Sequence, residues 1–332
     1  MAWTEGDLNV RGVKLHYYRR GSGRPVVLAH GFSDNGLCWD RVATVLDDRY
    51  DVIAYDARFH GKSEAPADGS FGDGKDLCAL VEALGLETPA AVGHSMGAGT
   101  VAQAVRERPE LFRCAILEDP AWRDEWPGTA RIEMPKWSEL SLEKVIELGK
   151  KQSPDWHDDE FPAWAESKQQ MRIPAGWSMR RAGMMQDWRP GAEGIGVPTL
   201  LIRGGNAAKG AIVSGEIAAE AQRLNPKIET VCFAQAGHNI RREAFAPYVA
   251  RELAKGLFNV SVARVAWHSE DGVIIFVLNR HSNPPPQQVV ATENHARHRA
   301  FVKAGLNANP AELSPARPEA ENRGRRGRAR RR

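Results

Sequence analysis

Short apolar runs rich in β-branched residues alternate with amphipathic stretches from the start of the chain to about residue 258. The continuous apolar run at 25–30 is typical of a strand buried on both faces, and similar runs follow at 50–55, 90–92, 114–117, 199–202 and 228–233. Amphipathic stretches lie between most of them, at 77–84, 98–108, 212–224 and 241–257. This alternation predicts an α/β fold with a mostly parallel, doubly wound sheet covered by helices.

Two segments of this region break the alternation. Residues 9–17 read as a β-hairpin with Arg11-Gly12 at its turn. Residues 120–192 lack a strand pattern but contain seven of the ten tryptophans and five of the seven methionines. We therefore expect a helical insertion between two strands. Its aromatic residues either form a small core of their own or line an adaptable apolar pocket.

The pattern changes again after residue 258. Two apolar runs, 260–267 and 273–278, flank Asp271-Gly272 and predict a second hairpin, which is followed by an Arg-rich tail at 323–332. Residues 259–332 carry 13 Lys and Arg against 6 Asp and Glu, so the formal net charge of +3 conceals a basic end on an acidic remainder. Such a tail is usually disordered and contacts phosphates nonspecifically. Because residues 323–332 contain no aromatic residue and no RNA-binding motif accompanies them, no nucleic-acid partner is expected.

Other classes are excluded by what the sequence lacks. No apolar stretch approaches the roughly 20 residues of a membrane-spanning helix, and the first residues have no basic start or apolar core of a secretory signal. Cysteines 38, 78, 114 and 232 form no CxxC pair and no zinc-type spacing. We expect a cytoplasmic protein with free thiols, no metal, no cofactor and no membrane partner.

The strongest local signal is Gly93-His94-Ser95-Met96-Gly97, which follows the 90–92 strand and precedes a helix. A nucleophilic serine in this position needs a tight strand-to-helix turn that lifts its hydroxyl above the sheet, and the crowded backbone there requires glycine on both sides. The context predicts Ser95 as a catalytic nucleophile.

A second element ends the 25–29 strand. The turn at His30-Gly31-Phe32 can aim the Phe32 amide at the oxygen on which negative charge develops in acyl transfer. The Met96 amide, at the start of the helix after Ser95, would supply the second donor together with the helix dipole. These two amides are the predicted oxyanion hole.

With these motifs the chain resembles the α/β-hydrolase superfamily over residues 8–258. The resemblance includes the segment from Asp56 to Ser63, in which relatives usually carry glycine where this chain has Phe59. It implies an α/β-hydrolase core at 1–119 and 193–258, a helical cap at 120–192 and an extension at 259–332. It also implies that Asp56, Arg58 and His60 brace their loop.

The superfamily orders its catalytic residues as nucleophile, acid and histidine. His238 follows the last predicted strand and is therefore the expected general base. Many relatives place the acid after the strand at 199–202, but this loop contains Asn206 and no carboxylate. Some members carry the acid one strand earlier, and Asp119 lies there, 24 residues after Ser95. The prediction is Asp119, and the alternative is that Glu118 and Asp119 merely open the insertion.

The resemblance implies hydrolysis of a carboxylic ester or lactone through an acyl-enzyme, with amides, thioesters and activated carbon–carbon bonds as further possibilities. The Trp-rich insertion favours an apolar or aromatic small molecule, with Trp122, Trp126 and Phe32 as predicted substrate-binding residues. A non-hydrolytic receptor or a degenerate member of the fold is the competing hypothesis, because the acid is missing after 199–202.

Overall fold

The computed structural model describes residues 1–125, 136–173, 186–249, 261–268, 273–279 and 287–291. The chain divides into two compact units, Met1–Ser261 and Val262–Arg332, and each is described by itself. The hairpin turn predicted at Asp271-Gly272 and the tail at 323–332 lie outside the described residues.

One sheet organises the first unit. Its described strands follow the order β1-β2-β4-β3-β5-β6-β7-β8, and they are β1 Thr4–Val10, β2 Val13–Gly21, β3 Arg24–Ala29, β4 Tyr50–Tyr55, β5 Ala90–His94, β6 Cys114–Glu118, β7 Thr199–Gly204 and β8 Ile228–Phe233. The six strands from β4 to β8 pair in parallel, whereas β1 with β2 and β2 with β4 pair antiparallel. The predicted mostly parallel sheet and the β1–β2 hairpin are therefore confirmed. Arg11 and Gly12 both adopt positive φ at the hairpin turn.

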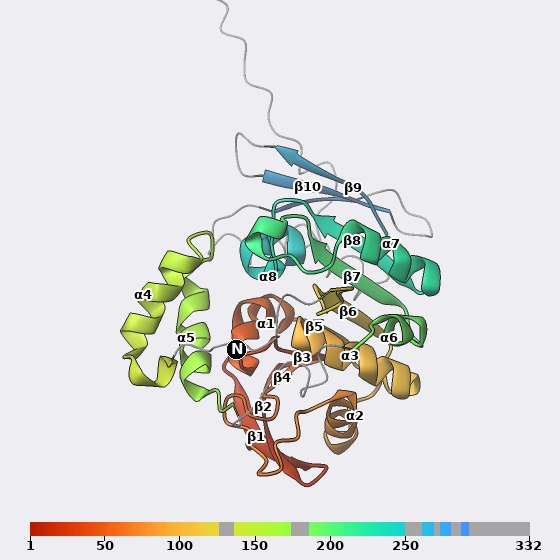
Figure 1. The fold of residues 1–332 in the computed structure, drawn as a ribbon. Helices are drawn as coiled ribbons and strands as arrows, with labels where there is room; N and C mark the ends of the chain where they lie inside the picture. Colours follow the sequence, from red (N-terminus) through yellow and green to blue (C-terminus); the bar gives the residue numbers. More distant parts are fainter. Residues whose placement is uncertain (126–135, 174–185, 250–260, 269–272, 280–286, 292–332) are drawn as a thin grey trace, which may run out of the picture. The chain divides into compact units, whose positions relative to one another are not determined.

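Helices cover both faces of this sheet (Figure 1). They are α1 Asp40–Leu46, α2 Gly74–Ala83, α3 Met96–Glu107, α7 Gly215–Leu224 and α8 Ile240–Glu243, with 3-10 turns η1 Gly36–Trp39, η2 Pro109–Leu111 and η5 Ala207–Lys209. Polar caps start several of them: the Asp73 carboxylate accepts the Lys75 and Asp76 amides of α2, and the Ser214 hydroxyl accepts the Ile217 amide of α7. The helix predicted over 241–257 is interrupted at Ala244, and 250–257 lie outside the described residues.

The core is divided between the two faces because successive side chains of a strand point to opposite sides. Val26 and Leu28 of β3 pack with α1 and with Ile240 of α8, whereas Val27 and Ala29 pack with α2, α3 and α7. This double burial explains the continuous apolar runs of the central strands.

The described parts of the segment between β6 and β7 contain helices and no strand, as predicted. It contains η3 Trp137–Glu139, α4 Leu142–Gln152, η4 Asp158–Glu160, α5 Phe161–Gln170 and α6 Arg189–Glu193. Trp137 and Trp164 pack with Val145 and Phe161 into a separate small core, against which Trp156 also packs. These tryptophans serve the insertion's own stability, whereas Trp126 and Trp177 lie outside the described residues.

The second unit contains a sheet in the order β11-β10-β9, whose strands are β9 Ser261–His268, β10 Val273–Asn279 and β11 Gln287–Ala291; of these residues only Ser261 is assigned to the first unit. The pair β9 and β10 was predicted, but β11 was not, because Gln287 and Gln288 interrupt any apolar run at its start. Within the described residues of the chain, no helix combines the length and apolar character that crossing a bilayer requires.

Candidate active site

Ser95 occupies a strained turn between β5 and α3. β5 ends at His94 and α3 begins at Met96, and Ser95 has φ 53° and ψ −113°. A Cβ atom at Gly93 would lie 2.3 Å from the Gly97 carbonyl oxygen, and one at Gly97 would lie 2.2 Å from the Ala29 carbonyl oxygen. A side chain at either position would clash with the backbone, so both positions require glycine. This is the steric requirement that the G-x-S-x-G pattern predicted.

Asp119 lies at the end of β6 and is completely buried. Its amide donates to the Ile202 carbonyl of β7 at 2.8 Å. Its carboxylate accepts the Ile212 amide at 2.9 Å and the Val213 amide at 3.0 Å, and its Oδ2 lies 2.7 Å from Nδ1 of His238. Both carboxylate oxygens are thus occupied, which satisfies a charge that would otherwise be costly to bury.

His238 follows β8 and is held from both sides. Its amide donates to the Lys209 carbonyl at 3.3 Å, while Glu243 accepts the amides of Gly237 at 2.7 Å and Asn239 at 3.2 Å. A carboxylate at Nδ1 assigns the proton to that nitrogen, so Nε2 keeps its lone pair and can accept a proton. The His238 ring lies 4.7 Å from the ring of His94, the residue before Ser95, and its side chain is 23% exposed.

Asn206, in the loop where relatives carry the acid, serves the local turn instead. Its side-chain oxygen accepts the Lys209 amide at 3.3 Å, and its own amide donates to the Ala236 carbonyl at 3.0 Å. The loop after β7 contributes the Ile212 and Val213 amides to Asp119 rather than a carboxylate to His238. Of the two candidate positions for an acid, the structure brings Asp119 into contact with the histidine.

The turn after β3 passes directly beside Ser95. A Cβ atom at Gly31 would lie 2.6 Å from Nδ1 of His94 and 3.5 Å from Cβ of Ser95, so only glycine fits there. Phe32 comes next, with its ring edge-on to His60 at 5.7 Å, and Met96 is the first residue of α3. Both predicted oxyanion residues therefore belong to segments that adjoin Ser95, and their role stays a prediction.

Buried histidines brace the same turn. His30 Nδ1 lies 2.8 Å from the Gly31 carbonyl oxygen, and its Nε2 accepts the Ala57 amide at 3.0 Å. His60 uses the same pattern, with Nδ1 2.8 Å from the Arg58 carbonyl and Nε2 accepting the Ser33 amide at 3.2 Å. Each ring must be neutral to accept at Nε2, and burial accordingly lowers the pKa of both, that of His60 to about 3.

The neighbouring segment from Asp56 to Ser63 is anchored as the resemblance implied. Asp56 accepts the Gly36 amide at 2.7 Å and the Lys62 amide at 2.8 Å. The Arg58 guanidinium pairs with Asp76 at 2.6 Å. Phe59 adopts φ 69° where relatives carry glycine, and it is buried and stacked on Phe71 with ring centroids 4.7 Å apart. Burial of the ring offsets the strain of a left-handed backbone.

Unfolding measurements can test the neutral state of His60. The unfolded histidine takes up a proton below about pH 6.5, whereas the folded one resists until about pH 3. The unfolded state is thus favoured as the pH falls through this window, by about 1.4 kcal/mol per pH unit for one histidine. We expect the free energy of unfolding in urea to fall less steeply between pH 6 and 4 in His60→Asn than in the wild type. Parallel profiles would show that folding does not lower the pKa of His60.

Of the predicted substrate-binding residues, Trp122 lies in the main core. It is 6% exposed and stacks on Trp188 with ring centroids 5.3 Å apart. Trp122 therefore packs in the core, and its contact with a substrate stays a prediction. Trp126 lies outside the described residues. The described residues contain no group of three or more His, Cys, Asp or Glu side chains suited to a metal ion.

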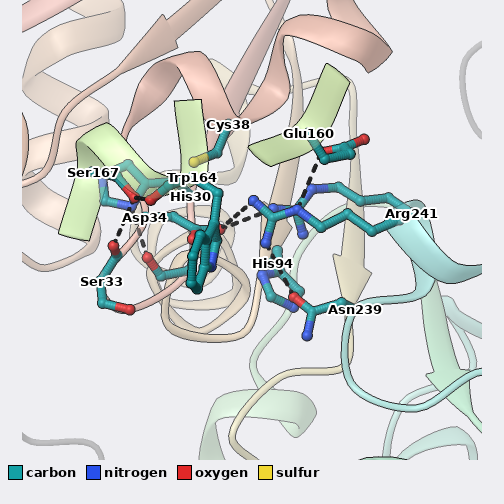
Figure 2. A network of polar contacts seen from close by, with 12 residues as sticks. His30, Ser33, Asp34, Cys38, His94, Glu160, Trp164, Ser167, Asn239 and Arg241 are labelled. Atoms are coloured by element: carbon teal, nitrogen blue, oxygen red, sulfur yellow. Dashed lines mark hydrogen bonds and ion pairs between the residues drawn. The ribbon is translucent and has the colours of Figure 1, made fainter. Parts of the chain in front are cut away.

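Sequence reasoning missed a buried network of charges around Asp34, which Figure 2 shows. Lys168 of α5 and Arg241 and Arg242 of α8 all bind its carboxylate, at 3.0 to 3.1 Å. Burial by itself would raise the pKa of Asp34, but the three cations hold it well below its usual range. The available signal was the Asp34 that follows His30-Gly31-Phe32 and the pair Arg241-Arg242 that follows His238.

The fold and this geometry define a class of protein. A family model described as alpha/beta hydrolase fold matches residues 24–241, about two thirds of the sequence, and the chain belongs to that family. The chain is 35% identical over 117 residues to an epoxide hydrolase of Caballeronia sordidicola, of whose length it spans 36%. It is 25% identical over 248 residues to an N-formylmaleamate deformylase of Pseudomonas putida, covering 71% of this chain and 90% of the relative. The crystal structure of an E-2-(acetamidomethylene)succinate hydrolase aligns with a TM-score of 0.60 at 22% identity, over 75% of this chain and 97% of the other.

Proposed function

We propose that this protein is a serine hydrolase that cleaves a carboxylic ester or lactone of an apolar or aromatic small molecule through an acyl-enzyme. The observation that carries the proposal is the 2.7 Å contact between Asp119 Oδ2 and His238 Nδ1. It lies at the carboxyl edge of the sheet, beside the strained turn that presents Ser95. A serine on such a turn, a histidine and a buried carboxylate are the parts that acyl transfer requires.

Each residue has a role in the proposed reaction. Ser95 Oγ attacks the substrate carbonyl while Nε2 of His238 takes its proton, and Asp119 stabilises the imidazolium that forms. The Phe32 and Met96 amides stabilise the tetrahedral oxyanion. The leaving group departs with the proton from His238. A water molecule that His238 deprotonates then attacks the acyl-enzyme and releases the acid and Ser95.

Family membership supports hydrolysis, and the geometry weakens the case for a non-hydrolytic receptor. That alternative arose from the missing carboxylate after β7, and the contact of Asp119 with His238 supports Asp119 as the acid instead. Epoxide hydrolases of this fold use an aspartate nucleophile, whereas the corresponding turn of this chain carries Ser95. This difference argues against epoxide hydrolysis. Hydrolysis of an N-acyl bond is a second candidate, because the relative matched over 90% of its length is named a deformylase. Esters remain the first choice because the leaving group of an ester depends least on protonation by His238, the general acid in this step.

Active-site titration tests the proposal. We expect p-nitrophenyl butyrate to give a burst of one nitrophenolate per chain, and a fluorophosphonate probe to label Ser95, located by mass spectrometry of the labelled peptide. A panel with a lactone, an N-formyl amide and a 1,3-diketone then ranks ester, amide and carbon–carbon cleavage. Absence of both burst and label from pH 5 to 9 would contradict the hydrolase proposal and favour a receptor.

A further inference from the structure

We propose that Lys168, on helix α5 of the insertion, is a positioning residue that fixes the turn carrying the Phe32 amide. This inference concerns the predicted oxyanion hole and therefore rests on the proposed function. The insertion would then contribute to stabilising the oxyanion, whether or not it also covers the substrate.

The Lys168 ammonium forms three hydrogen bonds, all of them to two consecutive residues of this turn. It donates to the Ser33 carbonyl at 2.8 Å, to the Ser33 hydroxyl at 3.0 Å and to Asp34 Oδ1 at 3.0 Å. An ammonium has three donors, so none is left for solvent. The side chain is 6% exposed, and its Nζ lies 4.9 Å from the ring centre of Trp164. Figure 2 shows Ser33 and Asp34 beside Trp164 and Ser167.

The turn requires an external hold because its backbone is strained. Ser33 has φ 65°, a left-handed conformation that costs a residue with a Cβ atom about 1 kcal/mol or more. Such a conformation persists only where neighbouring groups determine it. The Ser167 hydroxyl, also on α5, lies 3.0 Å from the Ser33 carbonyl oxygen and 2.7 Å from the Trp164 carbonyl oxygen, so these two acceptors share its one proton. His60 accepts the Ser33 amide.

These contacts bear directly on Phe32. On one side of it, Gly31 packs against His94 and Ser95, where no Cβ atom would fit. On the other side, Ser33 is held by Lys168 and Ser167 from α5. The direction of the Phe32 amide is thus set between the serine turn and the insertion. Oxyanion donors act through accurate placement, so a shift of this turn would weaken binding of the transition state more than binding of the substrate.

Lys168 and Asp34 form a buried ion pair. Burial lowers the pKa of Lys168, and the Asp34 carboxylate opposes this effect. Asp34 also binds Arg241 and Arg242, which lie three and four residues after His238 in the sequence. The same carboxylate therefore ties the insertion, the turn after β3 and the segment after the histidine together.

Hydrogen exchange in the full chain tests the inference without depending on activity. In Lys168→Met we expect the peptide covering 31–36 to exchange about tenfold faster, since charge-assisted hydrogen bonds are lost, with β5 unchanged. Ser167→Ala should give a smaller acceleration in the same peptide. Lys144→Met is the matched control, because Lys144 is an exposed lysine of α4 that pairs with Glu147. Unchanged exchange at 31–36, or equal acceleration in every element, overturns the inference. If Lys168→Met does not fold, Ser167→Ala decides by the same criterion.

Kinetics provide the second readout. With p-nitrophenyl butyrate we expect Lys168→Met to lower kcat about tenfold or more and to change KM by no more than about twofold. The affinity for an arylboronate inhibitor should fall by the same factor as kcat. A rise in KM at constant kcat would instead assign Lys168 to substrate binding and overturn its positioning role. A wild type without Ser95-dependent turnover would refute the proposed function, while the exchange result would still decide whether Lys168 fixes the turn.

Discussion

Ser95→Ala is expected to lower kcat for p-nitrophenyl butyrate by about 10⁵-fold or more and to abolish the burst, because no acyl-enzyme can form. The substitution is structurally mild. Alanine has the same Cβ atom as serine, so the strained turn at φ 53° gains no additional clash. The thermal unfolding midpoint should therefore change little, and KM or the affinity for an unreactive substrate analogue should remain close to that of the wild type.

A matched serine variant controls for this result. The Ser141 hydroxyl accepts the Lys144 amide at the start of α4. Ser141→Ala should cost about 1 kcal/mol of stability through the lost helix cap while leaving the burst intact. Turnover by Ser95→Ala within tenfold of the wild-type rate would mean that another residue or a bound water attacks the substrate.

Asp119→Asn is expected to lower kcat by about 10⁴-fold, because an amide can neither hold the required His238 tautomer nor stabilise the imidazolium. The substituted side chain also meets three donors, the Ile212 and Val213 amides and Nδ1–H of His238, with one oxygen instead of two. We therefore expect a loss of about 1–3 kcal/mol in the free energy of unfolding as well. Stopped-flow acylation rates and urea unfolding of the same preparation separate the two effects.

Asn206→Ala is the informative partner of this variant. Asn206 caps the turn at 207–209, so its removal should reduce kcat no more than a few-fold. If Asp119→Asn kept the full acylation rate while Asn206→Ala lost it, the acid assignment would be wrong. The comparison distinguishes the two loops in which this family places the acid.

The sequence predicted the fold well because its signals are local. Runs rich in apolar and β-branched residues located β3, β4 and β8 to within a residue or two. Burial explains this for β3 and β4, whereas β8 is partly exposed and carries Glu229. The ends of β5 and β7 were placed too early because His94, Arg203 and Gly204 lack an apolar signal, although these residues pair with the neighbouring strands. Helix α1 was missed because its seven residues are too few for a clear period.

The same limit applies to the site. The turn at Ser95 could be predicted because Gly93, Gly97 and the adjoining strand are neighbours in sequence. Trp122 was expected at a substrate pocket, but it stacks on Trp188, 66 residues later, within the main core. Composition indicates that tryptophans are gathered in a segment, but it cannot indicate which of them face the sheet and which face one another.

Sequence by itself therefore determined the order of strands and helices, the strained serine turn and the histidine after the last strand, because each depends on residues close together in the chain. Tertiary structure decided the rest. It brought Asp119 to His238 across 119 positions and Lys168 to Asp34 across 134. It also turned Asn206 towards its own loop. Such pairings depend on how parallel strands and the insertion come together at one edge of the sheet. A local sequence pattern does not encode contacts between residues that are so far apart in the chain.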